Sequence, residues 1–157
     1  MIKKLLDNKK ICKAILTVYI FILIYFVIFK LYMPFEYIMF SRQNVLANRA
    51  QGYYNINLIP FHSILSYFDL SVGINYWNIL GNTIPFAVLG ALSGTVKKEN
   101  TKLLRVWFFD ILLIFLFEMI QFVICIGTFD VDDIILNGSF CYIGIVLYKW
   151  LIDKINR

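Results

Sequence analysis

Three polar side chains interrupt an otherwise apolar stretch of the chain, residues 106–127. They are Asp110, Glu118 and Gln121. On a helix, at 100° per residue, Asp110 and Gln121 lie about 20° apart and Glu118 lies within about 80° of both, so all three share one face. A carboxyl group at the centre of a membrane-spanning helix costs about 2.5–3.5 kcal/mol. We therefore expect this face to meet other helices or water rather than lipid.

Amide side chains from two further apolar stretches are predicted to reach the same depth. Asn82 lies near the start of the stretch before this one, and Asn137 lies near the start of the stretch after it. We expect both to converge with Glu118 and Gln121 beneath an acidic rim. Two interpretations remain open: a polar plug that holds the helices in register through hydrogen bonds, or a pocket that opens outward for a polar head group.

The acidic rim consists of Asp130, Asp132 and Asp133, which occupy one short segment. Hard divalent cations prefer such oxygen ligands. Asp is also favoured at the start of a helix, where a carboxylate caps free N–H groups and interacts with the helix dipole. Capping is the favoured interpretation, and we predict no metal site.

A histidine, a serine and an aspartate also lie close together, at His62, Ser66 and Asp69. Their helical spacing does not give the geometry of a catalytic triad, and the sequence has no Gly-x-Ser-x-Gly turn of the kind that exposes a nucleophilic serine. We expect His62 to be an interfacial polar residue or to line a pocket. No catalytic residue and no cofactor are predicted.

The composition decides which class of protein must position these residues. Of the 157 residues, 61% are hydrophobic and 16% are charged, whereas a soluble domain carries roughly 25% charged residues. A chain this short cannot hide so much apolar side chain in a soluble core. Soluble enzymes and disordered chains are therefore excluded, and the three scattered Cys predict no disulfide framework. We predict an integral membrane protein with a single domain over residues 1–157.

Four apolar stretches have the ~20 residues needed to cross a bilayer. They cover about residues 14–33, 77–96, 106–127 and 134–152. The predicted fold is an all-α membrane protein, a bundle of four transmembrane helices. Residues 34–76 are too many for a simple loop and too apolar to float in water. We expect them to contain a short helix that lies in the interface or re-enters the membrane.

Glycines and a proline shape the second of these stretches. Gly81, Gly90 and Gly94 allow neighbouring helices to approach closely. Pro85 lacks an N–H group and is predicted to bend the helix.

The basic residues predict the orientation in the membrane. Most Lys and Arg flank the apolar stretches at the N-terminus, before residue 106 and at the C-terminus, whereas the other two loops contain only Arg42 and Arg49. By the positive-inside rule, both termini are cytoplasmic, and the acidic rim and residues 34–76 lie outside. This topology and anionic lipid explain the net charge of +5, so no nucleic-acid partner is predicted.

Four short motifs follow one another at corresponding positions of the predicted spans. They are Asn57-Leu-Ile-Pro-Phe61, Gly81-Asn82 with Phe86 and Gly90, Glu118-x-x-Gln121, and Gly127-Thr-Phe-Asp-Val-Asp-Asp-Ile-Ile-Leu-Asn137. In these motifs the sequence resembles the VanZ-like family of bacterial membrane proteins, over about residues 55–148. The resemblance implies a small helical protein of the bacterial cytoplasmic membrane. It also implies a link to teicoplanin, a lipoglycopeptide, because the founding member is associated with low-level resistance to that drug.

The resemblance also implies which positions matter. The residues that match the motifs of the family are Asn57, Pro60, Phe61, Gly81, Asn82, Glu118, Gln121, Asp130, Asp132, Asp133 and Asn137. Two positions depart from the pattern: Val88 stands where the family usually has Pro, and Phe140 stands where it often has Gly. Phe140 is expected to limit close helix packing or to fill part of a pocket.

The function that the resemblance implies is tolerance of lipoglycopeptide antibiotics of the teicoplanin type. An outward polar pocket would engage membrane lipids, a lipid-linked precursor of the cell envelope, or the lipid tail of the drug. Two alternatives remain open: a membrane enzyme that acts on a lipid-linked precursor through Glu118 and the acidic rim, and a non-catalytic membrane scaffold. The predicted pocket residues are Asn57, His62, Asn82, Glu118, Gln121, Asp130, Asp132, Asp133 and Asn137.

Overall fold

Helices account for nearly all of the regular structure in the chain. The computed structural model describes residues 8–29, 34–68, 73–97 and 101–155. Asp69 and the last residues of the first predicted span, 30–33, lie outside the described residues. In chain order the elements are α2 (Lys9–Phe29), α3 (Phe35–Ala50), β1 (Ile56–Asn57), α4 (His62–Tyr67), α5 (Tyr76–Val96), α6 (Leu103–Val123), β2 (Phe129–Asp130) and α7 (Val131–Ile155).

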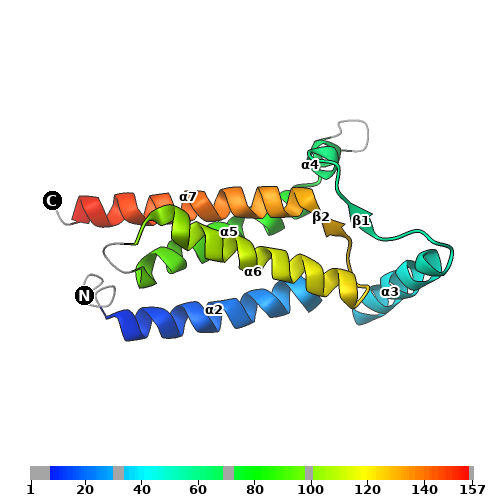
Figure 1. Cartoon of the computed structure of the whole chain (residues 1–157), viewed down its shortest axis with the longest axis horizontal. Coiled ribbons are helices and arrows are strands. Elements are labelled where there is room, and N and C mark those ends of the chain that lie inside the picture. The colour runs from blue at the N-terminus through cyan, green and yellow to red at the C-terminus, as the bar shows by residue number, and fades with distance from the viewer. Residues whose placement is uncertain (1–7, 30–33, 69–72, 98–100, 156–157) are drawn as a thin grey trace.

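Within the described residues, four helices are long and apolar enough to cross a membrane, namely α2, α5, α6 and α7. They run along the longest axis of the molecule (Figure 1). Their outer surfaces expose large apolar side chains such as Phe21, Ile84, Leu116 and Leu147. Helices that are apolar all round belong in lipid rather than in water. The chain is therefore an all-α membrane protein built on a four-helix bundle, as predicted.

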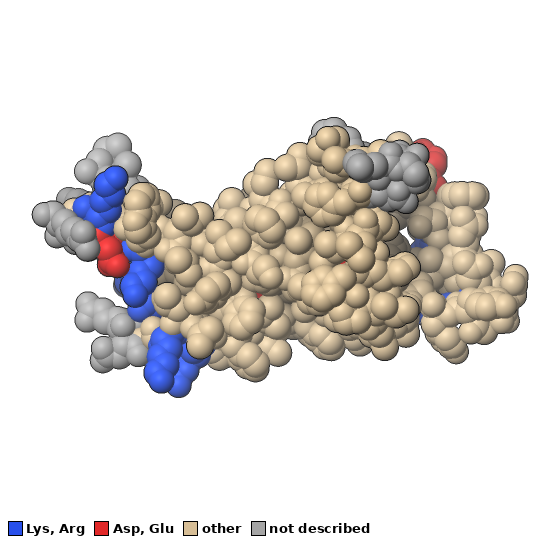
Figure 2. Space-filling view, turned by 90° about the horizontal axis from the view of Figure 1, so that it is seen from above, with Lys and Arg blue, Asp and Glu red and all other residues tan. Residues whose placement is uncertain are grey.

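The bundle has two unlike ends (Figure 1). At one end, here called the terminal end, α2 and α6 begin and α5 and α7 end. At the opposite end, here called the distal end, lie α3, α4 and both strands. Figure 2 shows Lys and Arg side chains gathered at the terminal end of the molecule. Basic residues at one end and apolar side chains along the middle are the charge pattern that the positive-inside rule describes.

A local turn signal ends α6 at Val123, earlier than predicted. The Ile126 N–H donates to the Gln121 carbonyl (3.1 Å), and the Cys125 N–H donates to the Phe122 carbonyl (3.3 Å). Cys125 has a positive φ of 61°. This is a Schellman motif, which satisfies the last helical carbonyls and reverses the chain. The turn leads directly into β2.

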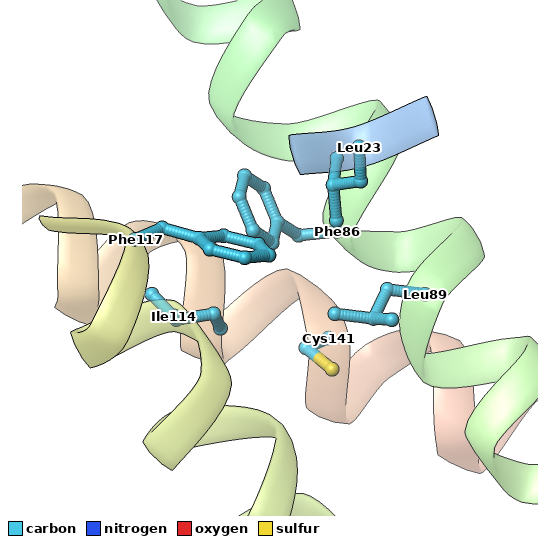
Figure 3. Packing of buried hydrophobic residues seen from close by; sticks show 6 residues of the cluster. All are labelled: Leu23, Phe86, Leu89, Ile114, Phe117 and Cys141. Carbon is cyan, nitrogen blue, oxygen red and sulfur yellow. The ribbon is translucent and has the colours of Figure 1, made fainter. Parts of the chain in front are cut away.

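The most extensive helix contact joins α5 and α7. A Cβ atom on Gly90 of α5 would lie 1.9 Å from the Cys141 carbonyl oxygen, and a Cβ atom on Gly144 of α7 would lie 1.9 Å from the Ala87 carbonyl oxygen. Only glycine fits at either position, so the predicted role of Gly90 in close helix approach is confirmed. The same prediction for Gly81 is wrong, because a Cβ atom there would meet nothing within 4 Å. Buried side chains form the core around this contact (Figure 3): Leu23, Phe86, Leu89, Ile114, Phe117 and Cys141.

The described residues between α2 and α5, 34–68 and 73–75, contain two helices and a strand, where the sequence predicts one short helix. β1 pairs in parallel with β2, with Ile56 opposite Phe129 and Asn57 opposite Asp130. This short pairing ties the segment to the start of α7, and α4 contacts both α7 and α5. α3 lies beyond the distal end of the four long helices (Figure 1).

Two arginines fasten α3 to the distal end of α6. Arg42 Nε donates to the Ile124 carbonyl (3.2 Å), and Arg49 Nη2 donates to the Phe122 carbonyl (2.6 Å). The Arg49 guanidinium also lies 4.3 Å from the centre of the Phe122 ring. These carbonyls close the C-terminus of α6, where the helix dipole favours cations. The spacing of the two arginines, which puts both on one helical face, was the available sequence signal for α3.

Replacing Arg49 by Leu is expected to release α3 while the bundle stays folded. The change removes two charge-assisted hydrogen bonds, to the Phe122 carbonyl and to Asn55 Oδ1, and a cation–π contact. Thermolysin should therefore cut within residues 35–50 about tenfold faster. Arg105→Leu, which removes an exposed arginine near the start of α6, is the matched control and should not change the cleavage rate. Equal cleavage of both variants would mean that other contacts hold α3.

Candidate functional site

Asp130 caps the start of α7 and joins it to β1 and α4. Its Oδ1 accepts a hydrogen bond from the Asp132 N–H (2.9 Å), which is the geometry of a helix N-cap. The same oxygen accepts a hydrogen bond from Asn57 Nδ2 (3.0 Å), and Ser63 Oγ donates to Oδ2. The capping interpretation is therefore confirmed for Asp130.

Asp132 is completely buried, and its carboxylate accepts three backbone N–H groups at the start of α4. Oδ1 accepts from Phe61 (2.5 Å), while Oδ2 accepts from Ser63 (2.7 Å) and Ile64 (3.2 Å). The first N–H groups of any helix lack acceptors within that helix, and here the carboxylate of Asp132, from α7, is their acceptor. Phe61 has a positive φ of 67°. Asp132 therefore holds both α4 and the strained turn before it.

Asp133 links α7 to α4 and α5. Its Oδ1 accepts hydrogen bonds from Asn82 Nδ2 (2.7 Å) and from the Tyr67 hydroxyl (3.4 Å). Burial and, to a lesser degree, the neighbouring Asp133 carboxylate raise the pKa of Tyr67 well above its ordinary value. The phenol therefore stays protonated and remains a hydrogen-bond donor throughout the physiological pH range.

A cavity of about 540 Å³ lies at the distal end, bordered by α2, α4, α5, α6 and α7. Glu118 and Asn137, which line it, are only 3% and 2% exposed. The structure thus brings polar groups from three long helices into one space, although their role as ligand residues stays a prediction. Six of the nine predicted pocket residues line it: Asn82, Glu118, Gln121, Asp130, Asp133 and Asn137.

The other three predicted pocket residues do not line the cavity. Asn57 binds Asp130, and Asp132 binds the N–H groups at the start of α4. His62 is exposed on α4. Sequence reasoning missed Tyr67 and Thr128, which do line the cavity. Tyr67 lies in a six-residue helix and Thr128 directly precedes β2. Tertiary contacts rather than a periodic pattern decide where such short pieces lie.

The two distal polar residues of α6 connect neighbouring elements while they face the cavity. Gln121 Nε2 donates to the Val27 carbonyl of α2 (2.8 Å). Glu118 Oε2 accepts from the Asp130 N–H at a longer 3.4 Å. These contacts connect the α6 side of the cavity wall to α2 and to β2.

Asp110 lies on the same face of α6 but belongs to a different cluster. Asp110, Glu118 and Gln121 are all buried, so the predicted shared face is confirmed. Asp110 accepts hydrogen bonds from Ser93 Oγ of α5 (2.7 Å) and Cys141 Sγ of α7 (3.3 Å). These bonds between helices make a polar plug near the terminal half. For Asn82, Glu118, Gln121 and Asn137, the choice between a plug and a pocket stays a prediction.

The acidic rim directs its oxygens mainly at protein donors. Asp130 and Asp132 cap helices, and Asp133 binds an amide and a phenol. Across residues 8–29, 34–68, 73–97 and 101–155, no group of three or more His, Cys, Asp or Glu side chains is arranged to hold a metal ion.

The sequence model of the VanZ/LLP1 family matches residues 16–152, a range that includes every residue lining the cavity. The chain belongs to the VanZ/LLP1 family. Among relatives of this VanZ-family chain, Protein VanZ of Enterococcus faecium is 29% identical over 141 residues, which are 90% of this chain and 75% of that protein. No solved structure matches the chain.

Proposed function

We propose that this VanZ-family protein contributes to tolerance of lipoglycopeptide antibiotics of the teicoplanin type. In this proposal it acts in the bacterial cytoplasmic membrane, where it engages a lipid-linked component of the cell envelope, or the lipid tail of the drug, at the outer leaflet. The observation that carries the proposal is the distal cavity, which combines buried polar side chains with an edge at the lipid-facing surface.

The orientation in this proposal follows from the basic residues. The Lys and Arg side chains gather at the terminal end (Figure 2). At the distal end, Arg42 and Arg49 are bound to carbonyls of α6. The positive-inside rule then favours a cytoplasmic terminal end, with both chain termini inside. The cavity would face the outer leaflet, the side that an antibiotic reaches first.

The edge of the cavity suits a molecule with a polar head and an acyl chain. Leu80 and Ile84 line the cavity and are 46% and 57% exposed, so its wall reaches the surface of α5. Ile84 also borders an apolar groove of about 500 Å³ between α5 and α7, which Phe140 lines as well. A ligand with its polar head in the cavity and its acyl chain in the groove would cross from one to the other at Ile84.

Drug susceptibility in a sensitive Gram-positive host tests the proposal. Strains would express the wild-type chain, Glu118→Gln, Asp133→Asn or an empty vector, with matched protein levels in the membrane. Teicoplanin and vancomycin are compared because only teicoplanin carries a lipid tail. We expect the wild-type chain to raise the inhibitory concentration of teicoplanin alone, and each variant to lose most of that increase.

Two exposed acids outside the cavity provide matched controls. Glu36→Gln and Asp153→Asn make the same chemical changes on α3 and at the end of α7, and should keep full protection. Absence of protection by a well-expressed wild-type chain would contradict the role in drug tolerance. Protection that survives both cavity variants would contradict the cavity as the site.

A further inference from the structure

The carboxylates at the distal cavity already have partners within the protein. Asp133 accepts hydrogen bonds from Asn82 and Tyr67, and Asp130 caps the start of α7. Glu118 accepts from the Asp130 N–H and has a further interaction, as has Asp133. A ligand is therefore not needed to balance the charge of this wall, and its recognition depends on the neutral polar groups that remain.

The Asn137 carboxamide is a neutral polar group of the cavity wall that the fold leaves open to a ligand. Among the described residues, its Oδ1 is the one buried side-chain oxygen or nitrogen without a hydrogen-bond partner. The side chain is 2% exposed and lines the cavity. Its Nδ2 remains available as a donor. Buried polar atoms in native proteins are normally paired, so this amide calls for a ligand that both donates and accepts.

Thr128 adds a second neutral group to the same wall. It is exposed, directly precedes β2 and lines the cavity. Its hydroxyl can both donate and accept a hydrogen bond. Two half-buried aromatic side chains, Phe26 and Tyr67, also line the cavity. They give a ligand an apolar surface, while the polar groups fix its orientation.

Few small chemical groups match a carboxamide that must be paired at both ends. An ionised phosphate or carboxylate offers only acceptors and leaves Asn137 Oδ1 without a donor, whereas an ammonium offers only donors and leaves Nδ2 without an acceptor. A trans secondary amide holds its N–H and C=O on opposite sides, so one carboxamide cannot bind both. Two adjacent hydroxyls can pair with Oδ1 and Nδ2 together, because each hydroxyl donates and accepts.

We infer that the distal cavity binds the hydroxyl groups of an uncharged sugar head. One hydroxyl donates to Asn137 Oδ1, its neighbour accepts from Nδ2, and Thr128 binds a further hydroxyl. The cavity volume of about 540 Å³ lies within the range of about 300–1,000 Å³ that is typical of small-molecule sites. The inference rests on the proposed function for an attached acyl chain and for the side of the membrane, whereas the hydroxyl preference rests on the cavity itself.

Native mass spectrometry of the full chain in a neutral polyoxyethylene detergent tests the inference. Five probes share a dodecyl chain and differ in the head: dodecyl glucoside, its tetra-O-methyl ether, N-dodecylacetamide, dodecylammonium and dodecyl phosphate. The methyl ether keeps the sugar ring and its oxygen acceptors but has no O–H donor. We expect dodecyl glucoside to be retained about tenfold more strongly than each of the other four, because it alone pairs both ends of the carboxamide.

Methyl glucoside separates two sources of the same chemistry, a membrane glycolipid and a soluble sugar. It carries the same head without the dodecyl chain. If it fails to displace dodecyl glucoside at equal concentration, the sugar head belongs to a lipid-like molecule. If it displaces dodecyl glucoside equally well, the site recognises a soluble sugar and the hydroxyl inference still stands.

Two cavity variants make the inference specific to the site. Asn137→Leu removes the donor and the acceptor together and should lower dodecyl glucoside retention about tenfold. Thr128→Val removes one hydroxyl at an exposed position with little change of shape and should lower retention about fivefold, so the test does not depend on the buried variant alone. Asn44→Leu on α3 and Thr17→Val on α2 make the same changes at exposed positions away from the cavity and should leave retention unchanged.

Four results would overturn the inference: equal retention of the methyl ether, equal retention of the amide or of a charged probe, unchanged retention in both cavity variants, or retention of no probe, which would mean that water alone satisfies Asn137. No drug is present in this measurement. Lost sugar preference with intact teicoplanin protection would therefore overturn the sugar inference alone, and the reverse result would overturn the proposed function alone.

Discussion

The Asp132→Asn variant is expected to lose about 3 kcal/mol of stability and to release α4 from the bundle. The native carboxylate is completely buried and accepts the N–H groups of Phe61, Ser63 and Ile64. An asparagine offers one acceptor oxygen and directs an NH₂ donor at backbone donors, so buried N–H groups lose their partner. Reversible unfolding in detergent micelles, followed by tryptophan fluorescence, would measure the loss.

An exposed aspartate on the same helix provides the control for this variant. Asp153→Asn makes the same substitution near the other end of α7, where the side chain is exposed, and should unfold like the wild type. Thermolysin cleavage within residues 58–68 reports on α4 separately from the bundle. A wild-type unfolding midpoint with α4 still protected would mean that the carboxylate of Asp132 does not hold this helix.

The spans were predictable because each is a long apolar stretch, and helical geometry is a local property. The same local geometry predicts the buried face of α6, where Asp110, Glu118 and Gln121 lie. α3 was not predicted, because the spacing of Arg42 and Arg49 fits one helical face but does not distinguish that face from ordinary loop charges. Their partners are carbonyls at the end of α6, and the place of that helix end relative to residues 35–50 is a tertiary property.

The sequence predicts the depth at which the residues of the candidate site lie in the bundle, but not their hydrogen-bond partners. Helix rise puts Asn82, Glu118 and Asn137 at similar depth, and all three line the cavity. The role of Asp132 depends on a strand pair of two residues, in which Asn57 and Asp130 meet from positions 73 residues apart. Two residues carry no periodic signal. The partner of a buried acid could therefore not be found without the structure.

The Gly90→Ala variant is expected to destabilise the contact of α5 and α7 by about 3 kcal/mol. The new Cβ atom would lie 1.9 Å from the Cys141 carbonyl oxygen. The backbone of α5 fixes the position of the Cβ atom, and the oxygen belongs to the backbone of α7, so no side-chain rotation relieves the clash. The helices must separate, which loosens the core around Leu89 and Cys141 (Figure 3). The higher helix propensity of Ala, about 1 kcal/mol, offsets only part of the loss.

Another glycine of the same helix supplies the control. A Cβ atom on Gly81 would meet nothing within 4 Å, so Gly81→Ala should be as stable as the wild type or slightly more stable, although it narrows the cavity. Unfolding in detergent micelles compares the two variants directly. Equal stability of Gly90→Ala and Gly81→Ala would contradict the close approach of α5 and α7.

Combining the glycine substitutions on both helices tests why each one lowers the stability of the protein. Gly144→Ala brings a Cβ atom to 1.9 Å from the Ala87 carbonyl oxygen, the reciprocal contact across the same interface. Each single variant should therefore cost a similar amount. The double variant with Gly90→Ala should cost less than the sum, because helices already separated by one Cβ atom leave room for the other. Strictly additive losses would mean that each clash is relieved by a local backbone shift, and that α5 and α7 stay together.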